Sequence, residues 1–480
     1  MQALDKEIPE SQPEAAATNG RADEQGARLL SPHERQESLG VRIAAAVFSE
    51  LNAMEIEYVA ISGYANYPDV VPSDVDIVIR EEARPRLPTA MQRAAARCGA
   101  RLISRLHYHY GMTYILTLQQ NGAVGSLWCD TATEFRQAGR LWLRSEDLLQ
   151  DRFMDSRGFY VAAPISRFVY HLIKKINKGK ITSQAESELS VIYRECSAAA
   201  GAYLERVFSP RTASLLKEAL VSGTWDKIRP EFTAIRREMH QHAALDGLQP
   251  RAHYLLMEGV RKVSRICAPT GICVAFMGPD GSGKSSVIEQ YLAALGPAFR
   301  QSACFHLRPH LLRGSAAAQA VNTDPQGQTP RGTSASLAKL LFLWVDYVLG
   351  YYLSVRPRLM RSTLVVFDRY YHDLLIDAVR FRYGGPRWLA RLVAELIPMP
   401  DLIFFLDAPA GVLQARKQEV SREESARQAE SYRVIANSAV LRGRGVLVDA
   451  ARALDKVVDE CADRTLALME MRTARRLHLN

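Results

Sequence analysis

The sequence of 480 residues lacks several features that would place it in a specialised class of proteins. Its seven cysteines are scattered, odd in number and without CxxC spacing, and some of them, such as Cys129 and Cys273, lie inside apolar runs. This pattern predicts reduced, mostly buried thiols and argues against a disulfide framework or a cysteine-based zinc site. No block of like charge is present, and the net charge of +9 is mild for this length, so we expect no nucleic-acid partner.

The sequence also lacks a segment typical of a targeting signal or a membrane span. The N-terminus is polar, without the basic and then apolar start of a signal peptide. The most apolar stretch, residues 337–355, carries Lys339, Asp346 and Gly350, so a buried or groove-lining helix fits it better than a spanning one. We therefore expect a cytoplasmic protein with no transmembrane span.

The sequence patterns typical of strands, helices and disordered segments divide the chain into four parts. Residues 1–38 are polar, without an apolar period, and are predicted to be disordered. Residues 39–160 contain predicted strands and form an α/β unit, whereas residues 161–268 contain helical patterns. Residues 269–480 return to alternating strands and helices, which is typical of a parallel sheet with helices on both faces. The expected strands are 58–62, 75–79, 114–118 and 126–129 in the first unit and 272–277, 363–367, 402–406 and 445–449 in the last, where residues 313–335 form a flexible insertion.

The most informative motif is a glycine-rich loop between an apolar run of strand length and a helical pattern. Gly278, four further residues, Gly283, Lys284 and Ser285 form the phosphate-binding loop pattern. Its glycines let backbone N–H groups turn toward a polyphosphate, and the N-terminus of the helix adds its dipole. Lys284 would reach the β- and γ-phosphates of ATP, and the Ser285 hydroxyl would ligate Mg²⁺. The predicted nucleotide-binding residues are Gly278, Asp280, Gly281, Ser282, Gly283, Lys284, Ser285 and Ser286.

Further charged residues follow the loop. Asp368 ends a predicted buried strand, where its carboxylate can hold the Mg²⁺ ion or orient the attacking group. Arg369 is then placed to grip a second phosphate in bidentate fashion. Residues 419–433, after the helix that carries Arg416, fit either a solvated helical pair or a lid whose arginines close over the transferring phosphoryl group. The predicted catalytic residues are Lys284, Asp368, Arg369 and Arg416.

Over about residues 270–465 these features together resemble the thymidylate kinase family of nucleoside monophosphate kinases. Residues 276–286 look like the phosphate-binding loop of that family, Asp368-Arg369-Tyr370 looks like its Asp-Arg-aromatic motif, and residues 400–408 look like its Pro-Asp-Leu strand. The resemblance implies that Asp280 lies near the acceptor sugar and that Arg369 binds the acceptor phosphate.

The resemblance does not extend to the acceptor. Residues 305–310 lack the Arg-Glu-Pro-Gly signature of the family, so thymidylate is not the implied acceptor. The chain looks like the divergent thymidylate kinase-like proteins found with bacterial surface-polysaccharide genes. For those proteins a sugar, a nucleotide-sugar precursor or a lipid-linked molecule would be the candidate acceptor.

A second carboxylate motif lies in residues 39–160. Ser62-Gly63, followed by Asp74 and Asp76, resembles the Gly-Ser turn and Asp-x-Asp strand with which the nucleotidyltransferase superfamily holds nucleotide phosphates and two metal ions. Because strand side chains alternate between faces, Asp74 and Asp76 share one face, as joint metal ligation requires. Asp130 is the candidate for a third carboxylate. Tyr64 stands where the family prefers Ser, and plain turn chemistry is the alternative explanation.

The sequence thus predicts an α/β enzyme that uses ATP and Mg²⁺ to phosphorylate a small nucleotide or sugar-type acceptor. Two alternatives stay open: nucleotidyl transfer centred on Asp74 and Asp76 with the C-terminal unit as an ATP sensor, or a non-catalytic ATP-binding protein of polysaccharide assembly. Asp368 and Arg369 favour the kinase, because a sensor needs no clamp for an acceptor phosphate. The expected partners are ATP and a small-molecule acceptor, with a homodimer as the candidate assembly.

Overall fold

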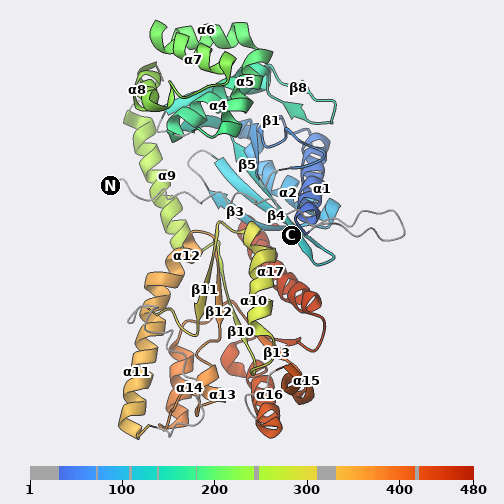
Figure 1. Ribbon diagram of the computed structural model, residues 1–480, viewed down its shortest axis with the longest axis vertical. Coiled ribbons are helices and arrows are strands. Elements are labelled where there is room, and N and C mark those ends of the chain that lie inside the picture. The colour runs from blue at the N-terminus through green and yellow to red at the C-terminus, as the bar shows by residue number, and fades with distance from the viewer. Residues whose placement is uncertain are drawn as a thin grey trace, which may run out of the picture.

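The computed structural model describes residues 32–71, 74–107, 111–137, 140–179, 181–242, 248–310, 331–416 and 421–479. These residues form two α/β units, one above the other in Figure 1, with a helical block at the far end of the first. Helix α9 (Leu248–Cys267) runs along one side of the molecule from the helical block to the second unit (Figure 1). The expected fold class is confirmed: the protein is a mixed α/β protein whose C-terminal sheet is parallel and flanked by helices.

The first unit is built on a mixed sheet that has seven strands in the described part of the chain, in the order β3-β4-β5-β2-β1-β9-β8. Helices α1 (Pro32–Ala53) and α2 (Leu87–Cys98) pack on one face of this sheet and form a core with its inward-facing residues. The strands are β1 (Tyr58–Ser62), β2 (Asp74–Ile79), β3 (Arg101–His107), β4 (Gly111–Gln120), β5 (Ala123–Ala132), β8 (Phe153–Met154) and β9 (Tyr160–Val161).

Helix α1 begins earlier than the apolar pattern indicated. Residues 32–38 are helical, although the sequence favoured disorder up to residue 38. Gly125 in β5 lies so close to this helix that a Cβ atom there would be 2.8 Å from the carbonyl oxygen of Gln36. Packing against the sheet therefore orders polar turns that carry no apolar signal of their own. Residues 1–31 of the segment expected to be disordered lie outside the described residues.

The helical block follows a short hairpin and has a core of its own. Helix α4 (Pro164–Lys178) connects this block to the first sheet, because its Tyr170 packs with Val59 and Ile61 of β1. The hairpin consists of β6 (Glu134–Gln137) and β7 (Arg140–Arg144), and the other helices are α3 (Ser145–Gln150), α5 (Ser183–Glu195), α6 (Ser197–Val207), α7 (Pro210–Ser222) and α8 (Phe232–His242).

The C-terminal unit has a parallel sheet with five strands in the described residues, in the order β11-β12-β10-β13-β14. All strands end at the same edge, so the segments that follow β10, β12 and β13 meet there. The strands are β10 (Ile272–Met277), β11 (Gln301–His306), β12 (Thr363–Asp368), β13 (Leu402–Asp407) and β14 (Gly445–Asp449). One face is covered by α10 (Lys284–Leu295), α15 (Ala410–Arg416) and α17 (Leu454–Leu477), and the other by α11 (Thr333–Gly350), α12 (Arg356–Met360), α13 (Asp373–Ile376), α14 (Arg387–Leu396) and α16 (Arg422–Ala436).

The two α/β units share a core. Ile103, Leu106 and Ile115 of the first sheet join residues of α10 and α17 in one buried cluster. The Thr473 hydroxyl of α17 donates to the carbonyl of Ile103 at 2.7 Å, and Arg101 forms an ion pair with Asp463 at 2.8 Å. The face of the first sheet opposite α1 and α2 is thus partly covered by the second unit.

Helix α11 contains most of the apolar stretch expected to be buried or to line a groove, and it continues through a π-helical turn, Tyr351–Val355, into α12. Leu340 and Tyr347 are buried in the core of the C-terminal unit, whereas Leu341 is exposed. Asp346 is fully buried, and its carboxylate accepts a hydrogen bond from Arg308 at 2.6 Å. Among the described residues, only the segment Thr333–Met360 is long and apolar enough to cross a membrane, by length and composition. Residues 311–330, which include most of the expected insertion, lie outside the described part.

Candidate active site

The loop between β10 and α10 lines a cavity of about 540 Å³ at the carboxyl ends of the parallel strands. Gly281 and Gly283 both have φ of +84°, a conformation that side chains disfavour, and a Cβ atom at Gly281 would lie 2.7 Å from the carbonyl oxygen of Leu413. Gly283 precedes α10, and no described side chain caps this helix. The N–H groups of its first turn therefore remain available to an anion.

Lys284 folds back into the loop. Its ammonium group donates to the carbonyl oxygens of Gly278 at 2.9 Å and Pro279 at 2.8 Å, and the side chain is buried. Burial, together with the positive charge of Arg369, lowers the pKa of Lys284 to about 7. The only carboxylate paired with it among the described residues is Asp280, at 3.9 Å, so a bound polyphosphate would add negative charge at closer range.

Asp368 lies across the cavity at the end of β12. Its Oδ1 atom is buried and has no hydrogen-bond partner among the described residues, while Oδ2 lies 3.3 Å from Nδ1 of His306. Burial alone would raise the pKa of Asp368, but the hydrogen bond from His306 and the charges of His306, Lys284 and Arg369 lower it below its ordinary value. Ser285, exposed in the same cavity, offers a hydroxyl oxygen. An ionised carboxylate with an unpartnered oxygen and a hydroxyl are hard oxygen donors, and they fit a Mg²⁺ ion that also binds phosphate oxygens and water.

Arg369 is buried at the floor of the same cavity. Its guanidinium donates to Asp373 at 2.9 Å and also to Asp280, which in turn accepts from Arg380 at 2.8 Å. The arginine expected to grip a second phosphate is therefore already held by two carboxylates. Its φ of +71° is unusual for a residue with a side chain. Such strained backbone conformations occur more often at functional sites than elsewhere. Arg380 lines the cavity with Arg369, although no motif in the sequence marked it.

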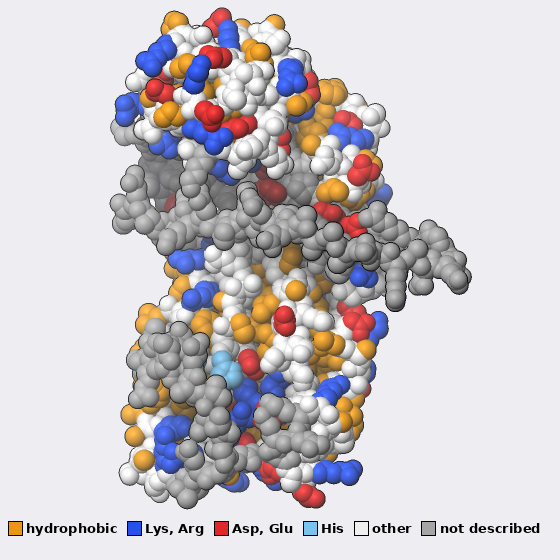
Figure 2. Space-filling view, viewed as in Figure 1, with side chains coloured by type: hydrophobic (Ala, Val, Ile, Leu, Met, Phe, Trp, Pro, Cys, Tyr) orange, Lys and Arg blue, Asp and Glu red, His pale blue; other side chains and the backbone are white. Residues whose placement is uncertain are grey.

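Two further arginines, Arg416 and Arg452, also line the cavity. Arg416, at the end of α15, donates to the carbonyl of Ala450 at 2.9 Å. Of the arginines in α16, Arg427 pairs with Glu424 and Arg433 with Asp407. These two arginines of α16 are thus engaged by carboxylates of the protein, and the lid formed by residues 419–433 stays a prediction. In the lower half of Figure 2, basic side chains gather beside a histidine and an acidic side chain, the same three kinds of side chain that line this cavity.

The carboxylates predicted in the first unit are brought together only in part. Asp76 and Asp130 are direct neighbours in the parallel β2–β5 ladder and line a separate cavity of about 220 Å³, whereas Asp74 is not among the residues that line it. Oδ2 of Asp76 accepts from Tyr170 and from Lys174, both at 2.9 Å. Burial raises the pKa of Asp130 to about 6 despite a hydrogen bond from Thr113.

These contacts do not present the expected set of three metal-binding carboxylates. An ammonium group already neutralises Asp76, and no group of three or more His, Cys, Asp or Glu side chains in the described part of the chain is arranged to hold a metal ion. The metal site at Asp74, Asp76 and Asp130 stays a prediction. Lys174 was not predicted as the partner of Asp76, because it lies on α4, about one hundred residues further along the chain.

Comparisons with known proteins bear on the C-terminal unit. Residues 276–461 match the Thymidylate kinase family model. Over 214 residues the chain is 24% identical to a thymidylate kinase from Leuconostoc mesenteroides subsp. mesenteroides, an alignment that covers 40% of this chain and 93% of that protein. The family match includes the glycine loop, Asp368, Arg369 and Arg416. The C-terminal unit is thus similar to thymidylate kinases, which supports a phosphotransferase of the nucleotide kinase type.

Proposed function

We propose that the protein is an ATP- and Mg²⁺-dependent kinase that acts on a small nucleotide or sugar-type acceptor. The observation that carries this proposal is the unpartnered Oδ1 atom of Asp368, which lies in one cavity with Lys284 and Ser285. A site that only senses ATP has less need of an ionised carboxylate with one buried oxygen that is free for a cation.

On the donor side, the glycine loop and the first turn of α10 would bind the β- and γ-phosphates through backbone N–H groups. Lys284 would exchange the carbonyls of Gly278 and Pro279 for phosphate oxygens. Asp368 and Ser285 would hold Mg²⁺, which neutralises phosphate charge when it is bound. Arg416, which lines the same cavity, would stabilise the charge that develops on the transferring group.

On the acceptor side, Asp280, Arg369 and Arg380 form one hydrogen-bonded cluster that faces the same cavity. Such a cluster offers a carboxylate oxygen to an acceptor hydroxyl and guanidinium N–H groups to an acceptor phosphate. It fits the class of small hydroxylated, phosphate-bearing acceptors.

The test is a turnover assay on the full chain with ATP, Mg²⁺ and a panel of nucleoside monophosphates, sugars and sugar phosphates. We expect acceptor-dependent release of ADP, and a loss of about 10²–10³ in kcat for Lys284→Ala, as for removal of one group that stabilises transition-state charge. Lys456→Ala, which removes an exposed lysine of α17, is the matched control and should retain turnover. Equal turnover of the Lys284 variant and the wild type at saturating ATP would contradict the proposal.

Nucleotidyl transfer in the first unit is the second candidate, supported by the side-by-side placement of Asp76 and Asp130 in a cavity. It would release pyrophosphate in place of ADP and would be abolished by Asp76→Asn and Asp130→Asn but not by Lys284→Ala. The link to polysaccharide assembly, the cytoplasmic location and the homodimer stay predictions.

A further inference from the structure

Helix α16 contacts the acceptor-side arginines, although none of its described residues lines the cavity at the glycine loop. Tyr432 of this helix is buried, and its hydroxyl donates to Oδ1 of Asp373 at 3.0 Å. Oδ2 of Asp373 accepts from Arg369 at 2.9 Å, and the same guanidinium nitrogen lies 3.5 Å from the Tyr432 oxygen. Burial raises the pKa of Tyr432 well above its ordinary value, so the hydroxyl keeps its proton and donates at neutral pH. Tyr432 thus reaches the cavity through Asp373 and Arg369.

A second residue of α16 makes a similar contact about one helical turn earlier. The side-chain amide of Gln428 donates to Oδ2 of Asp377 at 3.4 Å. Oδ1 of Asp377 accepts in turn from the backbone N–H group of Arg380 at 3.0 Å. Gln428 and Tyr432 are four residues apart, which places both side chains on the same face of the helix. This face of α16 therefore contacts both segments that carry the acceptor-side arginines.

Together these contacts form a closed network of hydrogen bonds. Arg369 and Arg380 both donate to the carboxylate of Asp280, which lines the cavity. The network thus passes through three carboxylates and two arginines, and both of its ends lie on α16. Its members are Tyr432, Asp373, Arg369, Asp280, Arg380, Asp377 and Gln428. All of them are buried except Asp280 and Arg380, which are partly exposed in the cavity.

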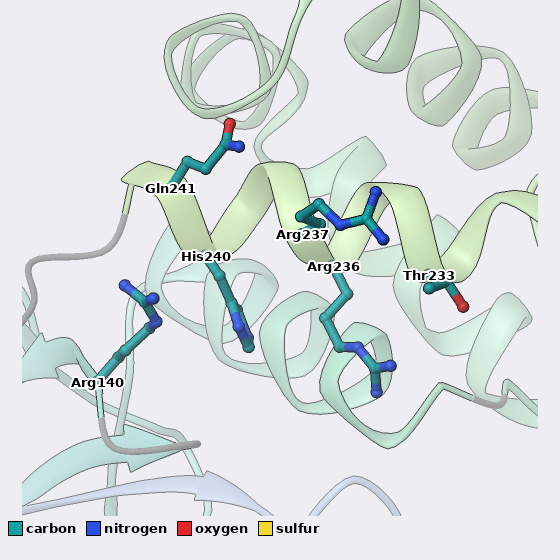
Figure 3. A pocket seen from close by; sticks show the side chains of 6 residues that line it. All are labelled: Arg140, Thr233, Arg236, Arg237, His240 and Gln241. Carbon is teal, nitrogen blue, oxygen red and sulfur yellow. The ribbon is translucent and has the colours of Figure 1, made fainter.

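A basic cavity of about 580 Å³ in the helical block shows a different arrangement (Figure 3). Arg140 of β7 and Arg236 and Arg237 of α8 line it, and no carboxylate is among its described lining residues. Arg236 donates to the backbone carbonyl of Asn177 at 3.4 Å. The network of carboxylates that fixes the arginines therefore distinguishes the cavity at the glycine loop from this one.

We propose that α16 positions the acceptor-side arginines, chiefly through the Tyr432 hydroxyl, an inference that rests on the proposed kinase function. An arginine and a carboxylate pair most strongly through two parallel hydrogen bonds. Tyr432 binds Oδ1 of Asp373, whereas Arg369 binds Oδ2. The second terminal nitrogen of Arg369 donates to Asp280 in the cavity. The hydroxyl therefore competes with a bidentate pair of Arg369 and Asp373, which would draw the guanidinium away from Asp280.

Removal of this hydroxyl has a specific expected result. Without it, Oδ1 of Asp373 is buried and unpaired, which is costly, and a second bond from Arg369 satisfies it. Asp280 then keeps Arg380 as its partner, while the acceptor loses one guanidinium group. The contact of Gln428 is longer than that of the hydroxyl, so its removal should have the smaller effect.

The first experiment is a crystal structure of the full chain with Tyr432→Phe, which removes the hydroxyl and keeps the phenyl group. We expect Arg369 to bind both oxygens of Asp373 and to leave Asp280. The matched control is Tyr371→Phe, because Tyr371 is a similarly buried tyrosine of the same core. Its hydroxyl donates to a backbone carbonyl of α14 at 3.0 Å and lies outside the network. A Tyr432→Phe structure in which Arg369 still donates to Asp280 would overturn the proposal.

The second experiment measures turnover with the nucleoside monophosphate, sugar or sugar phosphate that gives the fastest release of ADP. In Tyr432→Phe we expect the KM for this acceptor to rise at least about fivefold, while the KM for ATP changes less than about twofold. The loss in kcat should be smaller than the rise in the acceptor KM. Tyr371→Phe should change each constant less than about twofold. A role confined to stability would lower the unfolding temperature and leave the acceptor KM unchanged.

An unchanged acceptor KM in Tyr432→Phe, or an equal rise in Tyr371→Phe, would overturn the proposal. Gln428→Met is a second variant that removes the other contact of α16, and it should raise the acceptor KM more than about twofold. It decides the question if Tyr432→Phe does not fold. If the wild type releases no ADP with any acceptor, the proposed kinase function fails, and the position of Arg369 in the variant crystal structure alone decides whether α16 positions it.

Discussion

Asp368 and Arg369 are adjacent residues with different surroundings, and these surroundings separate the effects of replacing them. Asp368→Asn removes the negative charge of a carboxylate whose Oδ1 atom has no partner among the described residues. We therefore expect a large loss of kcat and a weaker response to Mg²⁺, with little change in thermal stability. Arg369→Ala removes the buried guanidinium that joins Asp280 and Asp373 and leaves Asp373 without an ion-pair partner, so it should also cost on the order of 3–5 kcal/mol of folding free energy. Kinetics and thermal unfolding of both variants test this difference. The same loss of stability in both would contradict the assignment of Asp368.

A buried histidine next to the site predicts how stability depends on pH. His372 is fully buried, neither ring nitrogen has a partner among the described residues, and burial lowers its pKa from 6.5 to about 4. The unfolded chain therefore takes up the proton first as the pH falls. The stability contributed by neutral His372 is complete above about pH 6.5 and is lost progressively as the pH falls toward 4.

Between pH 7 and pH 5 this single group should remove on the order of 2 kcal/mol of stability. His372→Leu should remove that part of the pH dependence while other groups keep theirs. The measurement is the pH dependence of the unfolding transition that shifts when ATP is added. Parallel curves for wild type and variant would show that His372 is not the group responsible.

At the residue scale, the sequence predicted the parts of the site that are contiguous in the chain. The glycine loop carries its own geometry, since glycines, Lys284 and Ser285 act within one turn of each other. Arg380, His306 and Arg452 were not predicted, because they lie in segments without a motif and reach the cavity only through the order of the parallel strands. The contacts of Arg369 with Asp280 and Asp373 were not predicted either, because two carboxylates that meet around an arginine leave no local pattern in the sequence.

Among the elements, the packing of α11 includes a buried charge whose stability depends on one ion pair. Asp346 is fully buried in this apolar helix, and Arg308, which follows β11, is its partner. Asp346→Leu alone leaves Arg308 with an uncompensated buried charge, so we expect a loss on the order of 3–5 kcal/mol. Adding Arg308→Leu should recover much of that loss, because both charges are then absent. A double-mutant cycle on the ATP-sensitive unfolding transition measures this coupling, and additive effects of the two substitutions would contradict it.

Element boundaries show where local patterns were insufficient. Strands β10, β12 and β13 were predicted almost to the residue, because buried parallel strands are continuous apolar runs bounded by polar turns, and β14 was predicted with the same bounds. Strand β11 was not among the expected strands, since its side chains are mostly exposed and form no apolar run. Strand β3 was not predicted, since Arg101 and Arg105 interrupt its alternation, and both β8 and β9 are only two residues long. The start of α1 was placed too late because contact with Gly125, and not an apolar period, holds its first turns.

For the whole molecule, the shared core means that the units do not unfold independently. Leu106 belongs to the first sheet but is buried with residues of α10 and α17. Leu106→Ala should therefore destabilise the ATP-sensitive transition by roughly 2–5 kcal/mol. The matched control is Leu87→Ala, which is equally buried but packs in the core on the opposite face of the same sheet. If Leu106→Ala and Leu87→Ala both leave the ATP-sensitive transition unchanged, the units are energetically separate.

Helix α17 connects the cavity of the C-terminal unit with the first sheet. Its 24 residues extend about 36 Å at 1.5 Å per residue, with Leu454 and Val457 in the wall of the nucleotide cavity at one end and Thr473 bonded to β3 at the other. Because α17 is one continuous helix, a rigid shift of its N-terminal end would also shift its C-terminal end. Thermodynamic reciprocity then applies: if nucleotide binding moves α17 against β3, a ligand of the first sheet that favours one position of α17 changes the nucleotide affinity by the same factor by which the nucleotide changes the affinity for that ligand. In that case the nucleotide affinity of the kinase-like unit depends on the state of the first sheet as well as on the residues of the cavity itself.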